Sequence, residues 1–458
     1  MAVVSHLRKK TLDFFWPLML ACAALAGVAP SANADDLLSI YRKAQSRDPV
    51  FEAARYMAQA ALEKLPQARA GLLPTLSLNG TSGQQKGEVA FSDAPFLDRE
   101  VRSSGSTLQF SQPLYRRANW VAYEQANAQV RQAVAQFEQA EQELILRVSQ
   151  SYLDVLVAQE SVTVAVFQLK AVEQQLGLAR RNFEVGTATV TDVHEAKSRF
   201  DLSRAQRISA VNDLEGKSAE LERIVGSTSG RLAGLRANVN LPDTEPAGLE
   251  AWLTQARNQY PLVRMQLAAQ EVAEHEIARN EAAHFPTLDL TASYGKSFAS
   301  GSITSPADIS TRSRSRQLGV QLSIPLYSGG GINARVREAI ANLGKARAEL
   351  DGARRQAAAL ARQAYAGITN GQAQTQALIS AVESSKNSVE ANKIGYRIGT
   401  RINIDVLNAE QQLYAAQRDL AKSKAETLMS SLRLKASTGS LQEADVQALN
   451  NLLENSPE

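Results

Sequence analysis

Gln109-Phe-Ser-Gln-Pro-Leu-Tyr115 is repeated later in the chain, with position 109 matched to position 321, as Gln321-Leu-Ser-Ile-Pro-Leu-Tyr327. The same offset relates Pro74-Thr-Leu-Ser-Leu78 to Pro286-Thr-Leu-Asp-Leu290. Both pairs have the alternating character of strands, and both copies of the longer motif end in Pro-Leu-Tyr. A register kept over such a distance indicates two copies of one structural unit, and repeated units usually build walls, tubes or rings.

The repeat continues toward the C-terminus after a slip of one position. Phe183-Glu-Val-Gly-Thr187 matches Tyr396-Arg-Ile-Gly-Thr400, and Thr191-Asp192-Val193 matches Ile404-Asp405-Val406. Gly186 and Gly399 occupy the position at which a helix C-terminus commonly takes a left-handed glycine. Each half is therefore predicted to contain two helices joined by a tight turn.

The N-terminal segment, 1–34, has the pattern of a secretory signal peptide. Arg8, Lys9 and Lys10 precede an apolar stretch over 14–28, and Ala32-Asn33-Ala34 provides a cleavage site, so the mature chain is expected to begin at Asp35. The only cysteine, Cys22, lies inside this segment; its lipidation remains an alternative, although Met19 replaces the usual leucine before it. The mature chain then has no disulfide chemistry.

Charge and hydropathy exclude several classes of protein. Removal of the signal takes three of the 50 basic and one of the 47 acidic residues, so the net charge falls from +3 to +1 and no polyanion-binding bias follows. After Asp35 no uninterrupted apolar run reaches the length of a transmembrane helix, so none is expected. An exported chain of this kind is either soluble or crosses a membrane as a closed β-barrel.

The repeat divides the chain into five predicted parts. They are a signal peptide (1–34), a first repeat (35–226), a linker (227–260), a second repeat (261–439) and a C-terminal tail (440–458), which contains a weak helix over 441–453. Each repeat is expected to open with a helix, over about 49–71 and 261–283, that begins at a proline.

Period-two patterns predict two strands in each repeat. Leu318, Val320 and Leu322 alternate with polar or small residues, and the strands after Pro74 and Pro286 alternate in the same way. Strands of this kind are the weak signature of an outer-membrane barrel, which needs at least eight strands. Four strands per chain therefore require several chains: three would give 12 strands, and two would give eight around a filled bore.

Two very long helices are predicted over 116–181 and 333–393, where neither proline nor a turn cluster occurs. Apolar residues step by three, four and seven, as in a coiled coil. About 60 residues of helix span roughly 90 Å. The predicted fold class is an α+β membrane protein with an internally duplicated helical barrel and a β-barrel to which each chain contributes four strands. The patterns do not decide between two and three chains, but a conducting bore favours a trimeric barrel of 12 strands. A periplasmic coiled-coil scaffold or adaptor without a pore is the alternative.

The stretch Tyr396-Arg-Ile-Gly-Thr-Arg-Ile-Asn-Ile-Asp-Val-Leu-Asn-Ala409, with its counterpart in the first repeat, resembles the TolC family of outer-membrane efflux and type I secretion channels. The resemblance covers the whole mature chain. It implies a homotrimer in the Gram-negative outer membrane, in contact with its lipid and extending into the periplasm. The trimer would passively conduct drugs or secreted proteins for an inner-membrane ABC or proton-driven transporter and a periplasmic adaptor. No cofactor or metal is implied.

The resemblance also implies functional residues. A gate latch would join Tyr396 and Arg401 to Thr191 and Asp192, although an Asp at this position also commonly caps a helix. Inward carboxylates would ring the constriction at Asp405, whereas Asn408 replaces the second ring. The adaptor-docking tips match Val185-Gly186-Thr187 and Ile398-Gly399-Thr400.

One hypothesis needs no family. Arg312, Arg314 and Arg316 continue the lipid-facing alternation of the last strand beyond its apolar residues, so they are expected to reach the phosphates of the outer leaflet. A solvated loop is the alternative.

Enzyme activity is not expected. The histidines His6, His194, His275 and His284 form no zinc pattern, and Gly329-Gly-Gly331 lacks the Lys-Ser/Thr of a phosphate loop. Aromatic residues make up only 6% of the chain and are scattered, so no nucleic-acid partner is expected.

Overall fold

The computed structural model describes residues 35–92, 94–227, 232–236 and 248–454. The predicted signal peptide with Cys22 and most of the predicted linker before residue 248 lie outside the described residues.

The first repeat contains five helices and two long strands. In chain order they are α1 (Leu37–Arg47), α2 (Pro49–Leu62), α3 (Lys64–Ala70), β1 (Thr75–Val89), β2 (Leu97–Tyr115), α4 (Arg117–Glu184) and α5 (Val190–Val225). The second repeat follows a short strand and a helix that lie within the range predicted as a linker, β3 (Gly234–Leu235) and α6 (Leu249–Gln259). It comprises α7 (Pro261–Glu281), η1 (Ala282–His284), β4 (Thr287–Ala299), β5 (Thr311–Ser323), α8 (Gly331–Arg397) and α9 (Asn403–Ser437). The chain closes with α10 (Glu443–Asn450) and β6 (Leu453–Glu454).

The predicted long helices are confirmed, and one predicted helix is divided. α4 and α8 have 68 and 67 residues, and their last residues, Glu184 and Arg397, are related by the offset of the sequence repeat. The helix expected over 49–71 breaks at Glu63 into α2 and α3, whereas its counterpart α7 is continuous. Pro66 accounts for the difference, because proline removes a helical N–H and clashes with the carbonyl four residues earlier.

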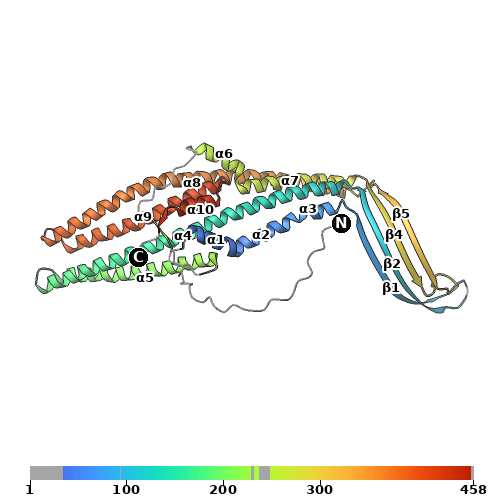
Figure 1. The fold of residues 1–458 in the computed structure, drawn as a ribbon, viewed down its shortest axis with the longest axis horizontal. Coiled ribbons are helices and arrows are strands. Elements are labelled where there is room, and N and C mark those ends of the chain that lie inside the picture. The colour runs from blue at the N-terminus through green and yellow to red at the C-terminus, as the bar shows by residue number, and fades with distance from the viewer. Residues whose placement is uncertain (1–34, 93, 228–231, 237–247, 455–458) are drawn as a thin grey trace, which may run out of the picture.

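The molecule is a rod with the sheet at one end and two helical hairpin tips at the other (Figure 1). The sheet is antiparallel in the order β1-β2-β4-β5, so β2 and β4 join the two repeats. The hairpins are formed by α4 with α5 and by α8 with α9, and α4 also packs against α9 and α7. The two repeats are thus interleaved in one body.

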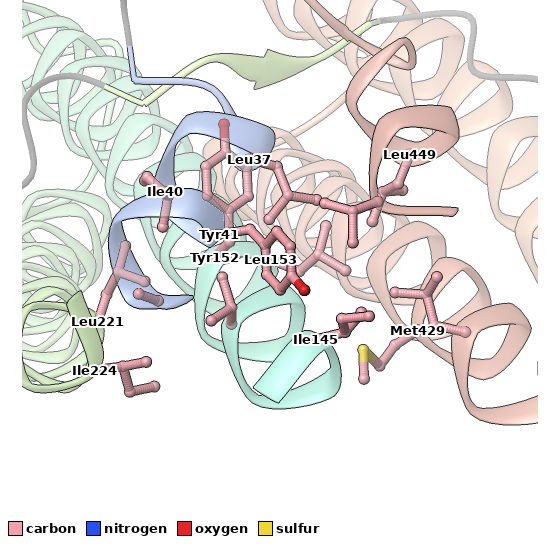
Figure 2. Packing of buried hydrophobic residues seen from close by; sticks show 14 of the residues in the cluster. Leu37, Ile40, Tyr41, Ile145, Tyr152, Leu153, Leu221, Ile224, Met429 and Leu449 are labelled. Carbon is pink, nitrogen blue, oxygen red and sulfur yellow. The ribbon is translucent and has the colours of Figure 1, made fainter. Parts of the chain in front are cut away.

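The main hydrophobic core lies at the middle of the rod, where α1 and α10 pack on the long helices (Figure 2). Tyr152 of α4 is fully buried there, and its hydroxyl donates to the Ala233 carbonyl at 2.7 Å. Leu37 and Ile40 of α1 cover it from one side, and Met429 of α9 lies nearby. A buried tyrosine needs such a partner for its hydroxyl, and this bond fastens the segment after α5 onto α4.

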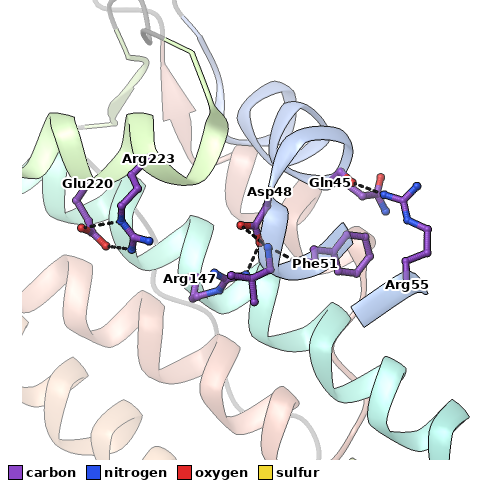
Figure 3. A network of polar contacts seen from close by, with 8 residues as sticks. Gln45, Asp48, Phe51, Arg55, Arg147, Glu220 and Arg223 are labelled. Atoms are coloured by element: carbon purple, nitrogen blue, oxygen red, sulfur yellow. Dashed lines mark hydrogen bonds and ion pairs between the residues drawn. The ribbon is translucent and has the colours of Figure 1, made fainter. Parts of the chain in front are cut away.

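A polar network beside this core fixes the start of α2 (Figure 3). Asp48 is buried, accepts from the backbone N–H of Phe51 at 3.2 Å and forms an ion pair with Arg147 of α4. The carboxylate therefore caps α2 and ties it to the long helix at once.

One window of α4 reaches a mean hydropathy of 1.4 over 18 residues, although the sequence has no uninterrupted apolar run of that length. By length and composition alone such a window would suffice to cross a membrane. Within the single chain 39% of the window is buried, and α4 packs against α5, α7 and α9, as a core helix does.

A bidentate ion pair marks the junction of sheet and helices. Arg116, just before α4, donates to both carboxylate oxygens of Asp289 in β4 at 2.8 and 2.7 Å, and Asp289 is buried. This geometry is the most definite that an arginine and a carboxylate form. It links the first repeat to the second where the strands give way to helices.

Candidate functional site

The two hairpin tips share one backbone conformation. Gly186 and Gly399 have φ of 77° and 79°, values that favour glycine. The N–H groups of Thr187 and Ala188 donate to the Asn182 carbonyl at 2.8 and 3.2 Å. In the second tip, the N–H groups of Thr400 and Arg401 donate to the Gly395 carbonyl at 2.9 and 3.2 Å. The predicted turns are confirmed. The two tips, which match in sequence, also have the same backbone hydrogen bonds.

Apolar side chains at both tips point into solvent. Val185 is 72% exposed and Ile398 68% exposed, and the neighbouring Val190 and Ile402 are also exposed. Exposed apolar groups clustered at the end of a rod are typical of a docking surface. The predicted residues Val185 and Ile398 are therefore accessible, each at its own turn.

The predicted latch residues of the first tip lie at the start of α5. Asp192 accepts from the backbone N–H and the hydroxyl of Thr189, both at 2.8 Å, while the Thr189 hydroxyl accepts from the Asp192 N–H at 3.2 Å. This is a capping box, so Asp192 caps the start of α5 within the single chain. Thr191 lies one residue before it and is exposed.

The predicted latch residues of the second tip have other partners within one chain. The Tyr396 hydroxyl accepts from the Asn182 side chain at 3.0 Å, which joins the ends of α8 and α4. Arg401 lies 3.8 Å from the Asp405 carboxylate, a long ion pair one helical turn apart. Within the described ranges of a single chain, neither residue bonds to Thr191 or Asp192. Sequence reasoning missed Asn182.

Gly395 provides the space that Arg401 occupies. A Cβ atom at position 395 would lie 2.6 Å from Cγ of Arg401, which is closer than such atoms approach. The aliphatic part of Arg401 thus lies over the helix end, and its guanidinium reaches toward Asp405. Asp405 also accepts from the Ile402 N–H at 3.5 Å.

The predicted ring position Asn408 is engaged by the first hairpin. Arg199 of α5 donates to the Asn408 side-chain oxygen at 3.1 Å and to the Gln411 side-chain oxygen at 2.7 Å. An asparagine at this position therefore serves as an acceptor between α5 and α9. Sequence reasoning missed Arg199, because its partners belong to the other repeat and are distant in the sequence.

A buried ion pair joins α8 to α9 above the second tip. Lys393 Nζ lies 3.1 Å from Glu410, whose side chain is only 2% exposed. Burial raises the pKa of Glu410, and the ion pair with Lys393 opposes that shift. The second Glu410 oxygen and the Asn403 amide are buried without a hydrogen-bond partner in the described structure. The sequence signal was available, because Glu410 follows Val406 and Leu407 at the spacing of a buried helical face.

The tips carry polar contacts between helices rather than a cluster of metal ligands. Across the residues that the structure describes, no group of three or more His, Cys, Asp or Glu side chains is arranged to hold a metal ion. The arrangement offers hydrogen bonds and ion pairs between helix ends, contacts that can open and close without covalent change.

Comparison with known proteins identifies the relatives of this architecture. The family model described as outer membrane efflux protein matches residues 40–227 and 252–440, one match in each half. The protease secretion protein PrtF of Dickeya chrysanthemi is 32% identical over 434 residues, 93% of each chain. The outer membrane protein TolC of Vibrio cholerae is 31% identical over 96% of this chain and 98% of that protein.

A solved structure shows the same fold. The crystal structure of the outer membrane protein VceC from Vibrio cholerae superposes with a TM-score of 0.74 at 18% identity, and covers 88% of this chain and 96% of that one. The chain is an outer-membrane channel protein of a Gram-negative bacterium, and it belongs to the outer membrane efflux protein family.

Proposed function

We propose that three copies of the chain form one channel-tunnel, with a 12-stranded barrel in the outer membrane. The observation that carries the proposal is the four-stranded sheet, in which β1 and β5 are both edge strands within one chain. Lipid offers no hydrogen bonds to an open edge. The smallest membrane barrels have about eight strands, and two chains would give a bore filled by side chains. Three chains leave room for a conducting bore.

The helices continue this bore toward the inner membrane. α4 and α8, with 68 and 67 residues, each span about 100 Å. The channel acts as a passive conduit with no catalytic step and no cofactor. An inner-membrane ABC or proton-driven transporter supplies the energy, and a periplasmic adaptor connects the two.

Exported polypeptides are the favoured substrate class. PrtF of Dickeya chrysanthemi is named for protease secretion, as is AprF of Pseudomonas aeruginosa, which is 33% identical over 90% of this chain. Both similarities run along nearly the whole chain, so they include the tips and the sheet. A drug substrate is the second candidate, since the family is described by efflux.

A cysteine cross-linking experiment tests the trimer. The only native cysteine is Cys22 in the predicted signal segment, so the mature chain offers a cysteine-free background. One cysteine on β1 (Ser77→Cys) is combined with a series along β5 that includes Ser313→Cys, and outer membranes are oxidised. We expect cross-linked dimers and trimers and no larger species, while each single-cysteine variant gives no such series of cross-linked species. A series that ends at the dimer, or continues beyond the trimer, contradicts the proposal.

The polar residues at the tips act as a gate in this proposal. Arg401 is 60% exposed and makes only a long ion pair in its own chain, so its guanidinium is accessible to a carboxylate of a neighbouring hairpin. The latch comprises Tyr396, Arg401, Thr191 and Asp192, closed between hairpins around the bore. Asp405 contributes one carboxylate from each chain, a ring of three that favours cations. Asn408 adds no charge to it.

The conductance of single channels in planar bilayers tests the gate. The double variant Tyr396→Phe, Arg401→Ser removes a hydroxyl and a charge from the latch, so we expect a severalfold larger open conductance. Arg397→Ser is the matched control, because Arg397 is exposed beside the same turn and makes no ion pair in the described structure. Equal conductance in the double variant and the control would remove the latch from the account.

The apolar tips are the proposed adaptor-docking surface. Val185, Gly186 and Thr187 form it in the first repeat, and Ile398, Gly399 and Thr400 in the second. The exposure of Val185 and Ile398 supports this role, since exposed apolar side chains grouped on a surface mark protein interaction sites. Replacing both with serine should abolish export while the purified channel still conducts.

A further inference from the structure

The two faces of the sheet have opposite character, and crowding identifies the inner one. A Cβ atom added at Gly105 would lie 3.1 Å from the Thr81 hydroxyl, and one at Gly295 would lie 3.0 Å from the Ser315 hydroxyl. Side chains converge on the concave face of a curved sheet, so this face of serine, threonine and glycine lines the bore. On the other face, Leu78 and Leu318 are 73% and 76% exposed. That face is the outer one.

The strand register arranges the outer face in rows. Residues directly opposite each other in neighbouring strands lie on the same face. The first row is wholly apolar: Leu76, Phe110, Ala292 and Leu318. The next row toward the loop end holds Leu78, Leu108, Tyr294 and Arg316. Two further rows hold Gly80, Ser106, Lys296 and Arg314, and then Ser82, Ser104, Phe298 and Arg312.

The apolar band therefore ends at four cations, Lys296, Arg312, Arg314 and Arg316, which we call the cationic rim. The expected alternation of the three arginines is confirmed by the register, and Lys296 joins them because it lies directly opposite Arg314. Like charges placed directly opposite each other destabilise a sheet. Their presence side by side indicates a site prepared for an anion.

Within the described chain, no carboxylate neutralises the rim. None of its four residues makes an ion pair there, and Glu100, which lies further along β2, is held by Lys86 and Arg102 at 2.9 and 3.3 Å. The rim instead contacts aromatic rings. Arg312 lies 5.6 Å from the centre of Phe298, while Lys296 and Arg316 lie 5.9 and 5.7 Å from the centre of Tyr294. These contacts hold the cations close to the sheet surface.

The rim borders a shallow hollow of about 780 Å³. Six of its lining residues lie on the outer face: Ser104, Ser106, Lys296, Phe298, Arg312 and Arg314. The intervening Gly105, Ser297 and Ser313, which alternate to the inner face, complete the lining. Guanidinium groups bind phosphate oxygens with two parallel hydrogen bonds, and serine hydroxyls can donate to the same group. The hollow thus combines serine hydroxyls, cationic side chains and an aromatic ring, and the apolar rows lie next to it toward the helices.

We propose that the cationic rim binds the phosphorylated headgroup of a lipid in the outer leaflet, with the acyl chains lying along the apolar rows. This inference rests on the barrel arrangement proposed above. The rim lies at the end of β4 and the start of β5, beside the connection between them. That end of the sheet is opposite the helices (Figure 1), so in an outer membrane the rim faces the outer leaflet. Tyr294 and Phe298 occupy the level at which membrane barrels carry aromatic side chains. A phosphorylated headgroup supplies the negative charge that the rim lacks.

The test measures lipid binding to the full-length protein in a neutral detergent. Purified lipopolysaccharide, dephosphorylated lipopolysaccharide and phosphatidylcholine are titrated, and bound lipid is quantified by native mass spectrometry. The variant Arg312→Gln, Arg314→Gln, Arg316→Gln is compared with Arg335→Gln, Arg337→Gln, Arg354→Gln, which removes the same charge from exposed positions of α8. Lys296→Gln is a milder second variant in case the triple variant fails to fold.

We expect wild type and the α8 control to bind lipopolysaccharide equally, and the rim variant to bind it about 100-fold more weakly, because each cation near an anionic surface adds to the attraction. Lys296→Gln should lose about fivefold on the same reasoning. Dephosphorylated lipopolysaccharide should bind wild type no better than phosphatidylcholine does, because the choline cation of that lipid balances its phosphate and leaves no net negative charge. Equal affinity of rim variant and wild type for lipopolysaccharide would overturn the inference.

Bilayer conductance separates this inference from the proposed function. A wild-type protein that conducts but shows no preference for the phosphorylated lipid contradicts the lipid site alone. A wild-type protein that does not conduct contradicts the proposed function, whatever lipid it binds.

Discussion

The α4–α5 hairpin and the α8–α9 hairpin have the same backbone and are stabilised differently. Their turns match in sequence, and both place a glycine in the left-handed region, at φ of 77° and 79°. In the first hairpin, Thr189 and Asp192 form a capping box. In the second, the isoleucine side chain at position 402 cannot accept a hydrogen bond. The Asp405 N–H donates instead to the Ile402 carbonyl at 3.1 Å, and the Asp405 carboxylate accepts from the Ile402 N–H at 3.5 Å. The duplicated unit kept its turn and changed its polar contacts.

The buried ion pair sharpens the contrast. Lys393 and Glu410 hold α8 against α9, whereas the matching positions of the first hairpin, Arg180 and Lys197, are both basic and exposed. The first hairpin instead has a capping box at the start of α5, and Asn182 links its α4 to Tyr396 in α8 of the second hairpin. The second is closed by a buried pair. This difference indicates that the two hairpins respond differently to pH and to mutation.

We expect the largest effect from replacing Lys393, the more exposed partner of the ion pair with Glu410. Lys393→Ala leaves Glu410 buried without its cation, and removal of one partner of a buried pair typically costs about 3 kcal/mol. We expect amides of the α8–α9 tip to exchange hydrogen about 100-fold faster, by mass spectrometry of the assembled protein.

Arg180→Ala in the first hairpin is the matched control, because Arg180 is exposed and makes no ion pair in the described structure. It should leave exchange unchanged. Equally fast hydrogen exchange in both variants would mean that the Lys393–Glu410 ion pair does not specifically stabilise the α8–α9 tip.

A pH dependence confined to the second hairpin is the next largest effect. Burial raises the pKa of Glu410, and the negative charge of Glu390 adds to the shift, while Lys393 opposes it. The folded hairpin then binds more protons than the unfolded one between the ordinary and the raised pKa of Glu410, so its stability falls as pH rises through that window.

Exchange protection of α9, corrected for intrinsic rates, should therefore decrease as the pH rises above the ordinary pKa of a glutamic acid, about 4.3. Glu410→Gln should remove the slope because it cannot titrate. A slope that persists in Glu410→Gln would assign the effect to another group.

We expect the smallest effects from changes at the two helix caps, one in each hairpin. Thr189→Ala should destabilise the start of α5 by about 1 kcal/mol, because it removes the acceptor for the Asp192 N–H. Ile402→Thr should stabilise the start of α9 by up to about 1 kcal/mol, because it adds a side-chain acceptor for the first turn of the helix at an exposed position. Local exchange at the two helix starts measures both. Opposite signs are expected, and equal signs would show that the caps do not explain the difference.

The sequence was sufficient for the architecture because the repeat, the periodicity and the turn glycines are local signals. The ends of α4 and α8, the strand alternation and the two turns follow from them. Where the expectation differed, the signal was also local but overlooked: Pro66 divides the first opening helix, and α6 lies in the range read as a linker.

The contacts of the site were harder to predict, because they join residues far apart in the chain. Asn182 and Tyr396 are 214 positions apart, and Arg199 reaches Asn408 across 209. Sequence spacing carries no information on such pairs, and one sequence offers no covariation. The turns at the tips and the alternation of the arginines could be predicted from the sequence pattern. The hydrogen-bond partners of Tyr396 and Asn408 could be identified only from the folded structure.

Single-channel recording of the purified protein in planar lipid bilayers distinguishes a conducting trimer from a protein without a pore. We expect discrete conductance steps that prefer cations because of the Asp405 ring, from a trimer that remains assembled in detergent. A detergent-solubilised protein that gives no conductance at any concentration, and behaves as a monomer, would contradict this expectation.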